Sequence, residues 1–485
     1  MPRVKPGERQ RAMAPKECAY VLSFLITQCC KTGRICDGYD SPSSTAVITQ
    51  PPTLIRVASS SAIAREARAL QFFVERTAIQ FGKFAPDDLW SSRVLQLAHS
   101  NTCIRHALIA LSSYHERYWS RDIGGETSYG LRQYNLAIGE LVKSGADRPS
   151  YLHIQLVSCT IFICIEILRR NIKNAIYLFK YGCRMIEGAV KQIGKDRYLG
   201  SATGISIEPI LRLVEAFFVR ISTQVFLVEA IGGDIDHNLA DTISPMLKLR
   251  TVNMTPKLTL SSIQEARDSL LKLALQYRRG MTVAQSRALG VSFDSWIEAF
   301  DEFRRTICRE SMNPTDKRAF ALLELHKRYL YINIAALNQP DRENPSMWDL
   351  WTEEFREMIE FATEAGGFDI ADAPTGSQPQ FYLEVGILPA LFFLSAKCRD
   401  PEVRRRAIDI MENNHVQEGI WNSQMAAKVA KRIIALEERE FLVKSSNDID
   451  DLMRVRRVAV HAGPEVAYLN VGYELQCGWV QEELD

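Results

Sequence analysis

Apolar residues recur with a helical period from about residue 63 to residue 443. In the first such stretch Ala67, Leu70, Phe73 and Val74 share one face, with the spacing of three and four residues that is typical of an amphipathic helix. This pattern predicts an all-α fold, a multi-helix array of antiparallel helices joined by short links. The predicted helical stretches are 67–81, 89–97, 104–111, 134–141, 154–168, 175–185, 209–231, 261–278, 293–309, 316–337, 349–362, 380–396, 401–411 and 420–442. Thr102 is the predicted N-cap of the third of them.

The pattern changes at both ends of the chain. Residues 455–462 alternate, and after Gly463-Pro464 the stretch 467–475 is rich in β-branched and aromatic residues, which predicts a small C-terminal β-hairpin. An isolated hairpin is marginally stable, so this one is expected to lie on the helical body. At the other end, residues 1–18 are basic and contain several prolines, and we expect a disordered N-terminal segment.

These changes divide the chain into four parts. Residues 1–40 form an N-terminal module, and residues 41–62 read as a linker because they hold Ser-Pro, Pro-Pro and a serine run. The helical body is expected to span residues 63–445. The hairpin and a tail then occupy residues 446–485.

Charge narrows the choice of partners. The formal net charge is +1, with 46% apolar and 24% charged residues, so the chain as a whole is not built to coat nucleic acid. Residues 1–60 differ, with eight Lys and Arg against four Asp and Glu. This excess of positive charge favours an approach to DNA, and it is equally what a solvated tail would show.

The eleven cysteines are scattered, and most lie in apolar helical stretches. This distribution is typical of a reducing compartment, where cysteine serves as a small core residue. The apolar run 19–27 is short and is not followed by a small-residue cleavage site, which argues against a secretion signal. The run 154–168 is short for a membrane span, so we expect a helix buried on most sides and no membrane partner.

One short fragment carries recognisable chemistry. Residues 29–39 read Cys-Cys-Lys-Thr-Gly-Arg-Ile-Cys-Asp-Gly-Tyr, with Cys29 and Cys36 separated by six residues. Glycine permits the positive φ that a loop folding tightly around a metal often needs. Thiolates are the preferred zinc ligands of such loops.

This fragment resembles the closing segment of the fungal binuclear zinc-cluster DNA-binding module. The resemblance implies six cysteines that share two zinc ions, with basic residues between the early cysteines that enter the major groove of DNA. In this chain Cys18, Cys29 and Cys36 match the pattern, whereas Ile26 occupies the position of a fourth ligand. The first two ligand positions fall near Glu8 and Arg11.

The candidate metal ligands are therefore Cys18, Cys29 and Cys36, with zinc as the implied cofactor. Three thiolates cannot complete a two-zinc cluster. The alternatives are a degenerate remnant, a wrongly joined first exon, a working cluster, or a mononuclear site completed by an outside ligand.

The helical body resembles the regulatory domain of the same fungal transcription factors. The likeness rests on residues 72–77, 90–99, 104–118, 131–138 and 166–169, and on Arg454-Val455-Arg456, which resembles the hairpin that closes many members. It implies a transcription regulator in the nucleus that binds DNA and forms homodimers or heterodimers with related factors. It implies no catalytic residue, and the chain is not expected to be an enzyme.

Enzyme signatures are missing from the sequence, which contains no phosphate-binding P-loop, nucleophile elbow or zinc-protease motif. His99, His106 and His115 are interpreted as core or surface residues, and the stretch 232–237 as a polar loop rather than a cation site. Trp90 and Tyr114 are interpreted as helix-packing residues. Two other functions stay open: a helical interaction protein without direct DNA binding, and a small-molecule sensor or enzyme with a pocket between helices.

Overall fold

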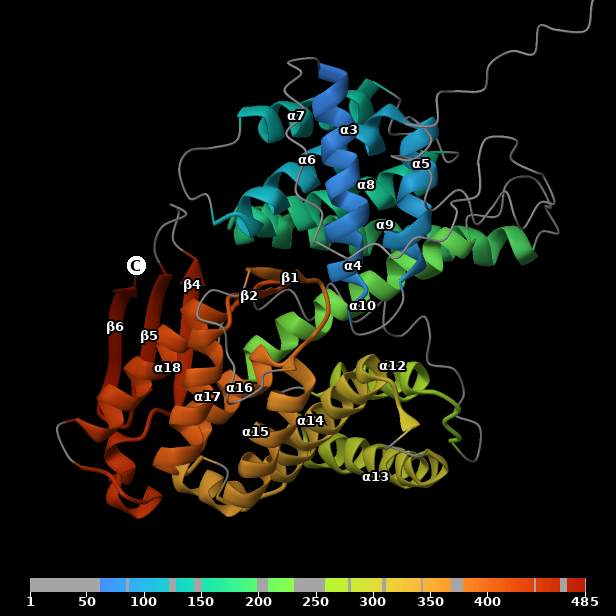
Figure 1. Cartoon of the computed structure of the whole chain (residues 1–485). Helices are drawn as coiled ribbons and strands as arrows, with labels where there is room; N and C mark the ends of the chain where they lie inside the picture. The colour runs from blue at the N-terminus through green and yellow to red at the C-terminus, as the bar shows by residue number, and fades with distance from the viewer. Residues whose placement is uncertain are drawn as a thin grey trace, which may run out of the picture.

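The computed structural model describes residues 62–83, 87–121, 128–143, 151–198, 208–230, 258–277, 281–307, 311–341, 343–367, 378–439, 442–462 and 469–484. Of the residues that can be described, 76% are helical, which confirms the all-α prediction. Figure 1 shows two groups of helices, one above the other, with a small sheet at one side of the lower group.

The upper, N-terminal group surrounds one apolar helix. It consists of α3 (Ala62–Phe72), the π-helix η1 (Phe73–Thr77), α4 (Ala78–Phe81), the π-helix η2 (Leu89–Arg93), α5 (Val94–Ser100), α6 (Thr102–Trp119), α7 (Ser128–Lys143), α8 (Leu152–Leu168), α9 (Ile172–Tyr198) and α10 (Glu208–Ala230). Every residue of α8 from Leu156 to Ile167 is buried, so this helix fills the centre of the group, as its apolar sequence predicts.

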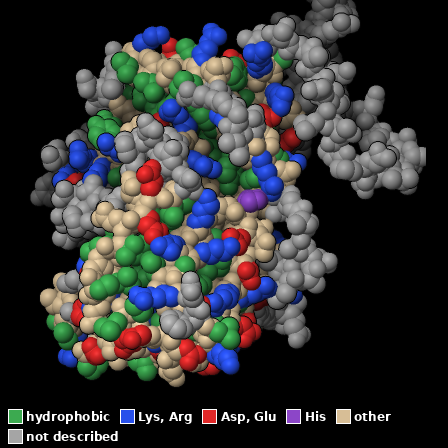
Figure 2. All heavy atoms as spheres, turned by 90° about the vertical axis from the view of Figure 1, so that its left-hand side faces the viewer, with side chains coloured by type: hydrophobic (Ala, Val, Ile, Leu, Met, Phe, Trp, Pro, Cys, Tyr) green, Lys and Arg blue, Asp and Glu red, His purple; other side chains and the backbone are tan. Residues whose placement is uncertain are grey.

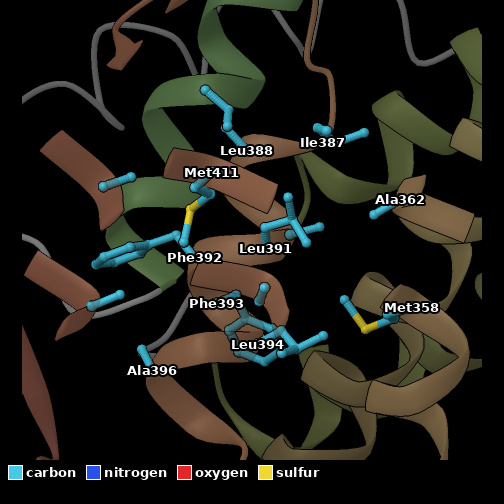
Figure 3. Close-up of a cluster of buried hydrophobic side chains, with 14 of the residues drawn as sticks. Met358, Ala362, Ile387, Leu388, Leu391, Phe392, Phe393, Leu394, Ala396 and Met411 are labelled. Carbon is cyan, nitrogen blue, oxygen red and sulfur yellow. The ribbon is translucent and has the colours of Figure 1, made fainter. Parts of the chain in front are cut away.

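The lower, C-terminal group is built around α16. Its helices are α12 (Ile263–Ala274), α13 (Val283–Thr306), α14 (Pro314–Leu337), the 3-10 helix η5 (Pro345–Trp351), α15 (Thr352–Gly366), α16 (Leu388–Lys397), α17 (Pro401–Asn413), α18 (Ser423–Glu438), and the short 3-10 helices η6 (Ser446–Asp448) and η7 (Asp451–Met453). All ten residues of α16 are buried. Figure 3 shows Leu391 and Phe393 of α16 among side chains of α15 and α17, including Met358 and Met411.

Two three-stranded sheets complete the described fold. The first joins β1 (Gln380–Tyr382) in parallel to β2 (Val416–Glu418), which pairs antiparallel with β3 (Trp421–Asn422). The second is antiparallel, in the order β4 (Arg457–Ala462), β5 (Leu469–Leu475) and β6 (Gly478–Leu484). The predicted hairpin is β4–β5, with Val460 opposite Val471, and it packs on the helical body as expected. The third strand, β6, was not predicted.

Several predicted boundaries are wrong. The stretch 380–396 was expected to be one helix, but it begins with strand β1 and a turn, and α16 starts only at Leu388. A continuous apolar run does not distinguish a strand from a buried helix, and here pairing with β2 decides. The stretch 420–442 likewise begins as β3, and α13 starts ten residues earlier than predicted because Thr282 and Gln285 form a capping box.

The N-cap of α6 is also corrected. The side chain of Asn101, not of Thr102, accepts a hydrogen bond from the backbone N–H of Ile104 at 3.2 Å. Thr102 is the first residue of the helix. Asparagine and threonine are both good N-caps, so composition alone did not separate these two neighbours.

Buried charges fasten the C-terminal sheet to the helices. Glu437 of α18 lies 2.7 Å from Arg399 and 2.8 Å from Arg404, and all three side chains are fully buried. Glu437 also accepts a hydrogen bond from the backbone N–H of Val455, at the entrance to β4, at 2.8 Å. Together with Glu438, which lies 3.6 Å from Arg404, this carboxylate balances the two buried arginines, and it also holds the start of the sheet.

We expect Glu437→Ala to destabilise the protein by about 3–5 kcal/mol, because it leaves the buried guanidinium of Arg399 without a carboxylate partner and leaves Arg404 with only Glu438, 3.6 Å away. The matched control is Glu353→Ala. Glu353 pairs with Arg356 at 2.5 Å but its side chain is 80% exposed, and its removal should change the free energy of unfolding by less than about 1 kcal/mol. Denaturant unfolding of both variants checks this, and equal losses would contradict it.

Candidate functional site: the polar seam around strand β1

The predicted zinc ligands Cys18, Cys29 and Cys36 lie outside the described residues. Within the part of the chain that is described, no three His, Cys, Asp or Glu side chains are placed to hold a metal ion. Cys103, Cys159, Cys164, Cys183 and Cys398 are buried, in keeping with the predicted role of cysteine as a core residue. The stretch 232–237 also lies outside the described residues.

A connected set of polar side chains surrounds strand β1, between the two groups of helices. Phe381 and Leu383 pack into the hydrophobic core of the N-terminal group, whereas Tyr382 and Val385 pack into that of the C-terminal group. Strand geometry explains the division of Phe381 and Tyr382, because successive side chains of β1 point to opposite faces, whereas Val385 lies beyond the end of the strand. We call the polar side chains that meet around β1 the seam: Gln80, Lys83, His115, Arg220, Gln224, Arg267, Glu384 and Glu418.

Side chains of the N-terminal group bind the strand directly. Gln80 accepts a hydrogen bond from the backbone N–H of Phe381 at 2.7 Å, and its oxygen lies 3.2 Å from Nε2 of His115. The other ring nitrogen of His115 lies 2.8 Å from the hydroxyl of Thr77, which is held in the π-helix η1. Burial lowers the pKa of His115 to about 3, so its imidazole is neutral. A neutral ring that donates to Gln80 and accepts from Thr77 satisfies all of these groups.

Lys83 extends this contact toward the C-terminal core. Its ammonium donates hydrogen bonds to the hydroxyl of Tyr382 and, at 3.1 Å, to the side chain of Gln380. It also lies 4.2 Å from the ring centroid of Tyr382, a cation–π contact. Burial, with a smaller contribution from Arg318, lowers the pKa of Lys83 to about 8.

An ion-pair chain crosses the seam on its other side. Arg220 of α10 lies 2.5 Å from Asp87 and 2.9 Å from Glu384, and Arg267 of α12 lies 2.6 Å from the second oxygen of Glu384. Asp87 uses its remaining oxygen to accept from the backbone N–H of Leu89 at 2.9 Å, at the start of η2. The chain thus links η2, α10 and α12 to the turn after β1.

Gln224 and Glu418 bind the backbone of the residues that follow β1. Gln224, fully buried on α10, donates to the carbonyl of Leu383 at 3.0 Å and accepts from the N–H of Ile420 at 3.2 Å. Glu418 accepts from the backbone N–H groups of Ile387 and Leu388, at 3.0 and 2.9 Å, and so caps α16. Burial raises the pKa of Glu418 to about 7, although these two donors favour its ionised form.

The three histidines interpreted as core or surface residues are described, and His99 is exposed on α5. His115 is fully buried in the seam, and His106 lies 2.6 Å from the side chain of Gln133. Trp90 and Tyr114 are buried packing residues, with Trp90 edge-on to Phe81. The remaining seam residues could not be predicted from the sequence, because their partners are brought together from up to 301 positions apart, as for Gln80 and Phe381.

A cavity of about 270 Å³ lies away from the seam, between α13, α14 and α15. It is lined by Arg304, Ile307, Met312, Phe320, Glu324 and Phe361. Its buried carboxylate, Glu324, is already paired with Lys327 at 2.8 Å and Arg328 at 2.7 Å. Although burial raises the pKa of Glu324, these two cations outweigh that effect and lower it. A cavity smaller than most ligand pockets, with a saturated carboxylate, gives no support to the small-molecule alternative.

Comparison with known proteins adds a family resemblance. Residues 68–223 match the model of the fungal specific transcription factor domain. The match begins in α3 and ends in α10, so it covers the N-terminal group up to the residue before Gln224. No solved structure matches the chain.

A relative covers most of the chain. The aspercryptin biosynthesis cluster-specific transcription regulator atnN of Emericella nidulans is 23% identical, over 85% of this chain and 84% of the relative. Together these similarities support the fungal transcription factor resemblance and a role in transcription regulation. The matched family and this relative are transcription regulators, not enzymes, which agrees with the prediction that the chain is not an enzyme. In addition, no helix among the described residues combines the length and apolar character needed to cross a membrane.

We expect Gly419→Ala to disrupt the seam. Gly419 has a φ of +51°, and an added Cβ would lie 1.8 Å from the side-chain oxygen of Gln224. Because Gln224 is buried and bonded on both sides, it cannot move away without losing hydrogen bonds, and we expect a loss of about 2–4 kcal/mol. The control is Gly188→Ala on α9, where nothing lies within 4 Å. This change should be neutral or stabilise the helix by up to about 1 kcal/mol. Thermal unfolding distinguishes the two, and a neutral Gly419→Ala would refute the packing described here.

We expect Glu418 to make stability fall as pH rises. The folded protein keeps a proton on Glu418 up to a pKa of about 7, whereas the unfolded chain releases it near the ordinary value of 4.5. The stabilisation is therefore fully present below pH 4.5 and is lost as pH rises through 7, and it amounts to about 3 kcal/mol. Glu418→Gln cannot titrate. The unfolding free energy of wild type minus that of this variant should therefore fall by about that amount between about pH 4 and about pH 8. Parallel pH profiles would show that Glu418 does not titrate in this range.

Proposed function

We propose that this chain is a nuclear transcription regulator whose helical body is its regulatory part. The observation that carries the proposal is the match of residues 68–223 to the fungal specific transcription factor domain. That match falls on the N-terminal group, which is bonded to the C-terminal group through Arg220 and Gln80. A partner that binds one group of helices would therefore bind a body in which both groups are joined by buried polar contacts.

We further propose that DNA is reached through the N-terminal module. Residues 1–60 carry the positive charge that attracts the phosphate backbone. Cys18, Cys29 and Cys36 are proposed as ligands of at most one zinc ion, because a two-zinc cluster needs six thiolates.

The incomplete set of thiols favours a second candidate function. In that case the helical body regulates transcription by binding intact relatives, as a homodimer or heterodimer partner, and does not contact DNA itself. Both candidates require the protein to reach the nucleus and to change transcription when it is held at a promoter.

The test joins a reporter assay to a DNA-binding assay. The full chain, fused to an unrelated DNA-binding domain, should change expression of a reporter that carries the matching sites, and a tagged chain should accumulate in the nucleus. Binding of the purified full chain to random duplex DNA is then measured at two salt concentrations, with and without zinc. Zinc per chain is measured in wild type, in Cys29→Ser and in the control Cys477→Ser, whose thiol is exposed in the turn between β5 and β6.

The outcomes separate the candidates. Zinc-dependent DNA binding that is lost in Cys29→Ser and kept in Cys477→Ser supports direct DNA recognition. A reporter effect without DNA binding supports the second candidate. Two zinc ions per chain would contradict the proposal that the three cysteines bind at most one zinc ion. A chain that stays outside the nucleus and leaves the reporter unchanged would overturn the proposed function.

A further inference from the structure

Helix α9 carries basic residues along the face that is turned away from the core. On its inner side Phe179 and Ile186 are buried in the core of the N-terminal group. On the other side Lys173 and Arg184 are exposed, and the side chain of Lys191 is 62% exposed. Because an α-helix has about 3.6 residues per turn, steps of eleven and seven residues return to the same face, so these three cations form one row.

This row has almost no acidic counterpart. Glu187 is the one acidic residue in the sequence between Lys173 and Lys191, and it lies 2.6 Å from Lys191. Within the described part of the chain, no ion pair involves Lys173 or Arg184. Charges of both signs are usually interspersed on a protein surface, as on the lower half of the face shown in Figure 2. The outer face of α9 is therefore a positive surface rather than a set of local ion pairs.

Two tyrosines and a glycine lie among these cations. Tyr177 is 70% exposed and Tyr181, one turn further on, is 51% exposed. Tyrosine hydroxyls are among the groups that bind the phosphates and sugars of DNA. At Gly188 nothing lies within 4 Å of the position of an added Cβ, so the packing of the described residues gives no reason for a glycine there. Glycine weakens a helix relative to alanine, but it lets a ligand approach the backbone closely.

We propose that this face of α9 binds the sugar–phosphate backbone of duplex DNA. At a rise of about 1.5 Å per residue, the row from Lys173 to Lys191 is about 27 Å long. A strand of duplex DNA presents a phosphate about every 3.4 Å, so about eight phosphates of one strand span the same length. The cations can then meet separate phosphates, with the two tyrosine hydroxyls between them. The main contacts of α9 among the described elements are with α8 and α10, on its inner side.

The composition of this face argues against a protein or a membrane as the partner. The centre of a protein–protein interface is apolar and depleted of lysine, whereas the large hydrophobic side chains exposed on α9 are those of Tyr177 and Tyr181. A helix that lies in a membrane surface needs an apolar face opposite its basic one. On α9 that apolar face, with Phe179, is already buried in the core.

This contact is distinct from the DNA contact proposed for residues 1–60. It lies on the helical body, within the segment that matches the family model, and it requires no metal ion. The inference does not rest on the proposed function, because it follows from the residues of α9 alone. The two contacts can be separated by measuring binding without zinc.

The salt dependence of DNA binding tests the proposal. The full chain carrying Cys29→Ser, without zinc, is titrated into a labelled random duplex of about 20 base pairs at about 50 and about 200 mM salt. Adding Lys173→Gln and Arg184→Gln should raise the dissociation constant about five-fold or more. It should also make the slope of log affinity against log salt less steep by about 2, since each lost phosphate contact contributes about 0.9. Tyr177→Ala should weaken binding without changing this slope, because tyrosine is neutral.

Matched controls separate α9 from overall charge. Lys272→Gln with Arg287→Gln makes the same charge change at exposed residues of α12 and α13, and it should leave binding unchanged. A second pair uses open helical positions. Gly188→Glu places a carboxylate on the proposed surface and should weaken binding, whereas Gly139→Glu on α7, where an added Cβ also meets nothing within 4 Å, should not. Circular dichroism and thermal unfolding verify that every variant folds.

The results that would overturn the proposal are distinct. Unchanged affinity and slope in the variant with Lys173→Gln and Arg184→Gln, or equal losses in the controls, would show that α9 is not the contact. Tighter binding to a single strand of the same length would show that the tyrosines stack on bases instead. Equal displacement of the duplex by polyglutamate would indicate an acidic protein partner. A chain that fails the reporter and localisation tests but binds duplex through Lys173 and Arg184 would overturn the proposed function alone.

Discussion

The fold depends on burying one short strand between two hydrophobic cores. β1 and the turn after it send Phe381 and Leu383 into one core and Tyr382 and Val385 into the other. A buried backbone must have its hydrogen bonds satisfied, and three residues cannot supply a sheet of their own. The partners come from far away: Gln80 from α4, Gln224 from α10, and Gly419, whose N–H donates to the carbonyl of Tyr382 at 2.7 Å. Each core therefore closes only when the other is in place.

Buried charges make this arrangement specific. Glu384 is 1% exposed and is neutralised by Arg220 and Arg267, which come from two different helices. Such pairs add little net stability over well-packed apolar residues, but an incorrect arrangement that leaves one charge unpaired is heavily penalised. We therefore interpret the seam as a device that fixes how α10 and α12 meet β1, rather than as a large source of stability.

The helical body could be predicted from the sequence where a local pattern decides the structure. The apolar run of α8 and the alternation in β4 depend on neighbours a few residues away, and both predictions are confirmed. The seam could not be predicted in this way. Strand β1 forms only because β2 lies beside it. In their register Gln380 is opposite Val416, thirty-six positions later in the sequence. Likewise, nothing adjacent to Gln80 or Glu384 in the sequence indicates that they will be buried against partners from other helices.

The contacts of the seam extend beyond the boundary of the family match. The family match stops at Thr223, one residue before Gln224, and includes His115, Arg220 and Gln80. The main partners of Arg220 and Gln80 lie on both sides of that boundary, since Glu384 and Phe381 belong to the C-terminal half. A segment cut at the boundary of the match would remove Phe381 from the rings of Phe81 and His115, and it would leave Asp87 as the only carboxylate that the described residues place beside Arg220. The matched domain therefore behaves as one half of a larger body, and any regulatory contact on it is made by a surface whose interior is completed from the other half.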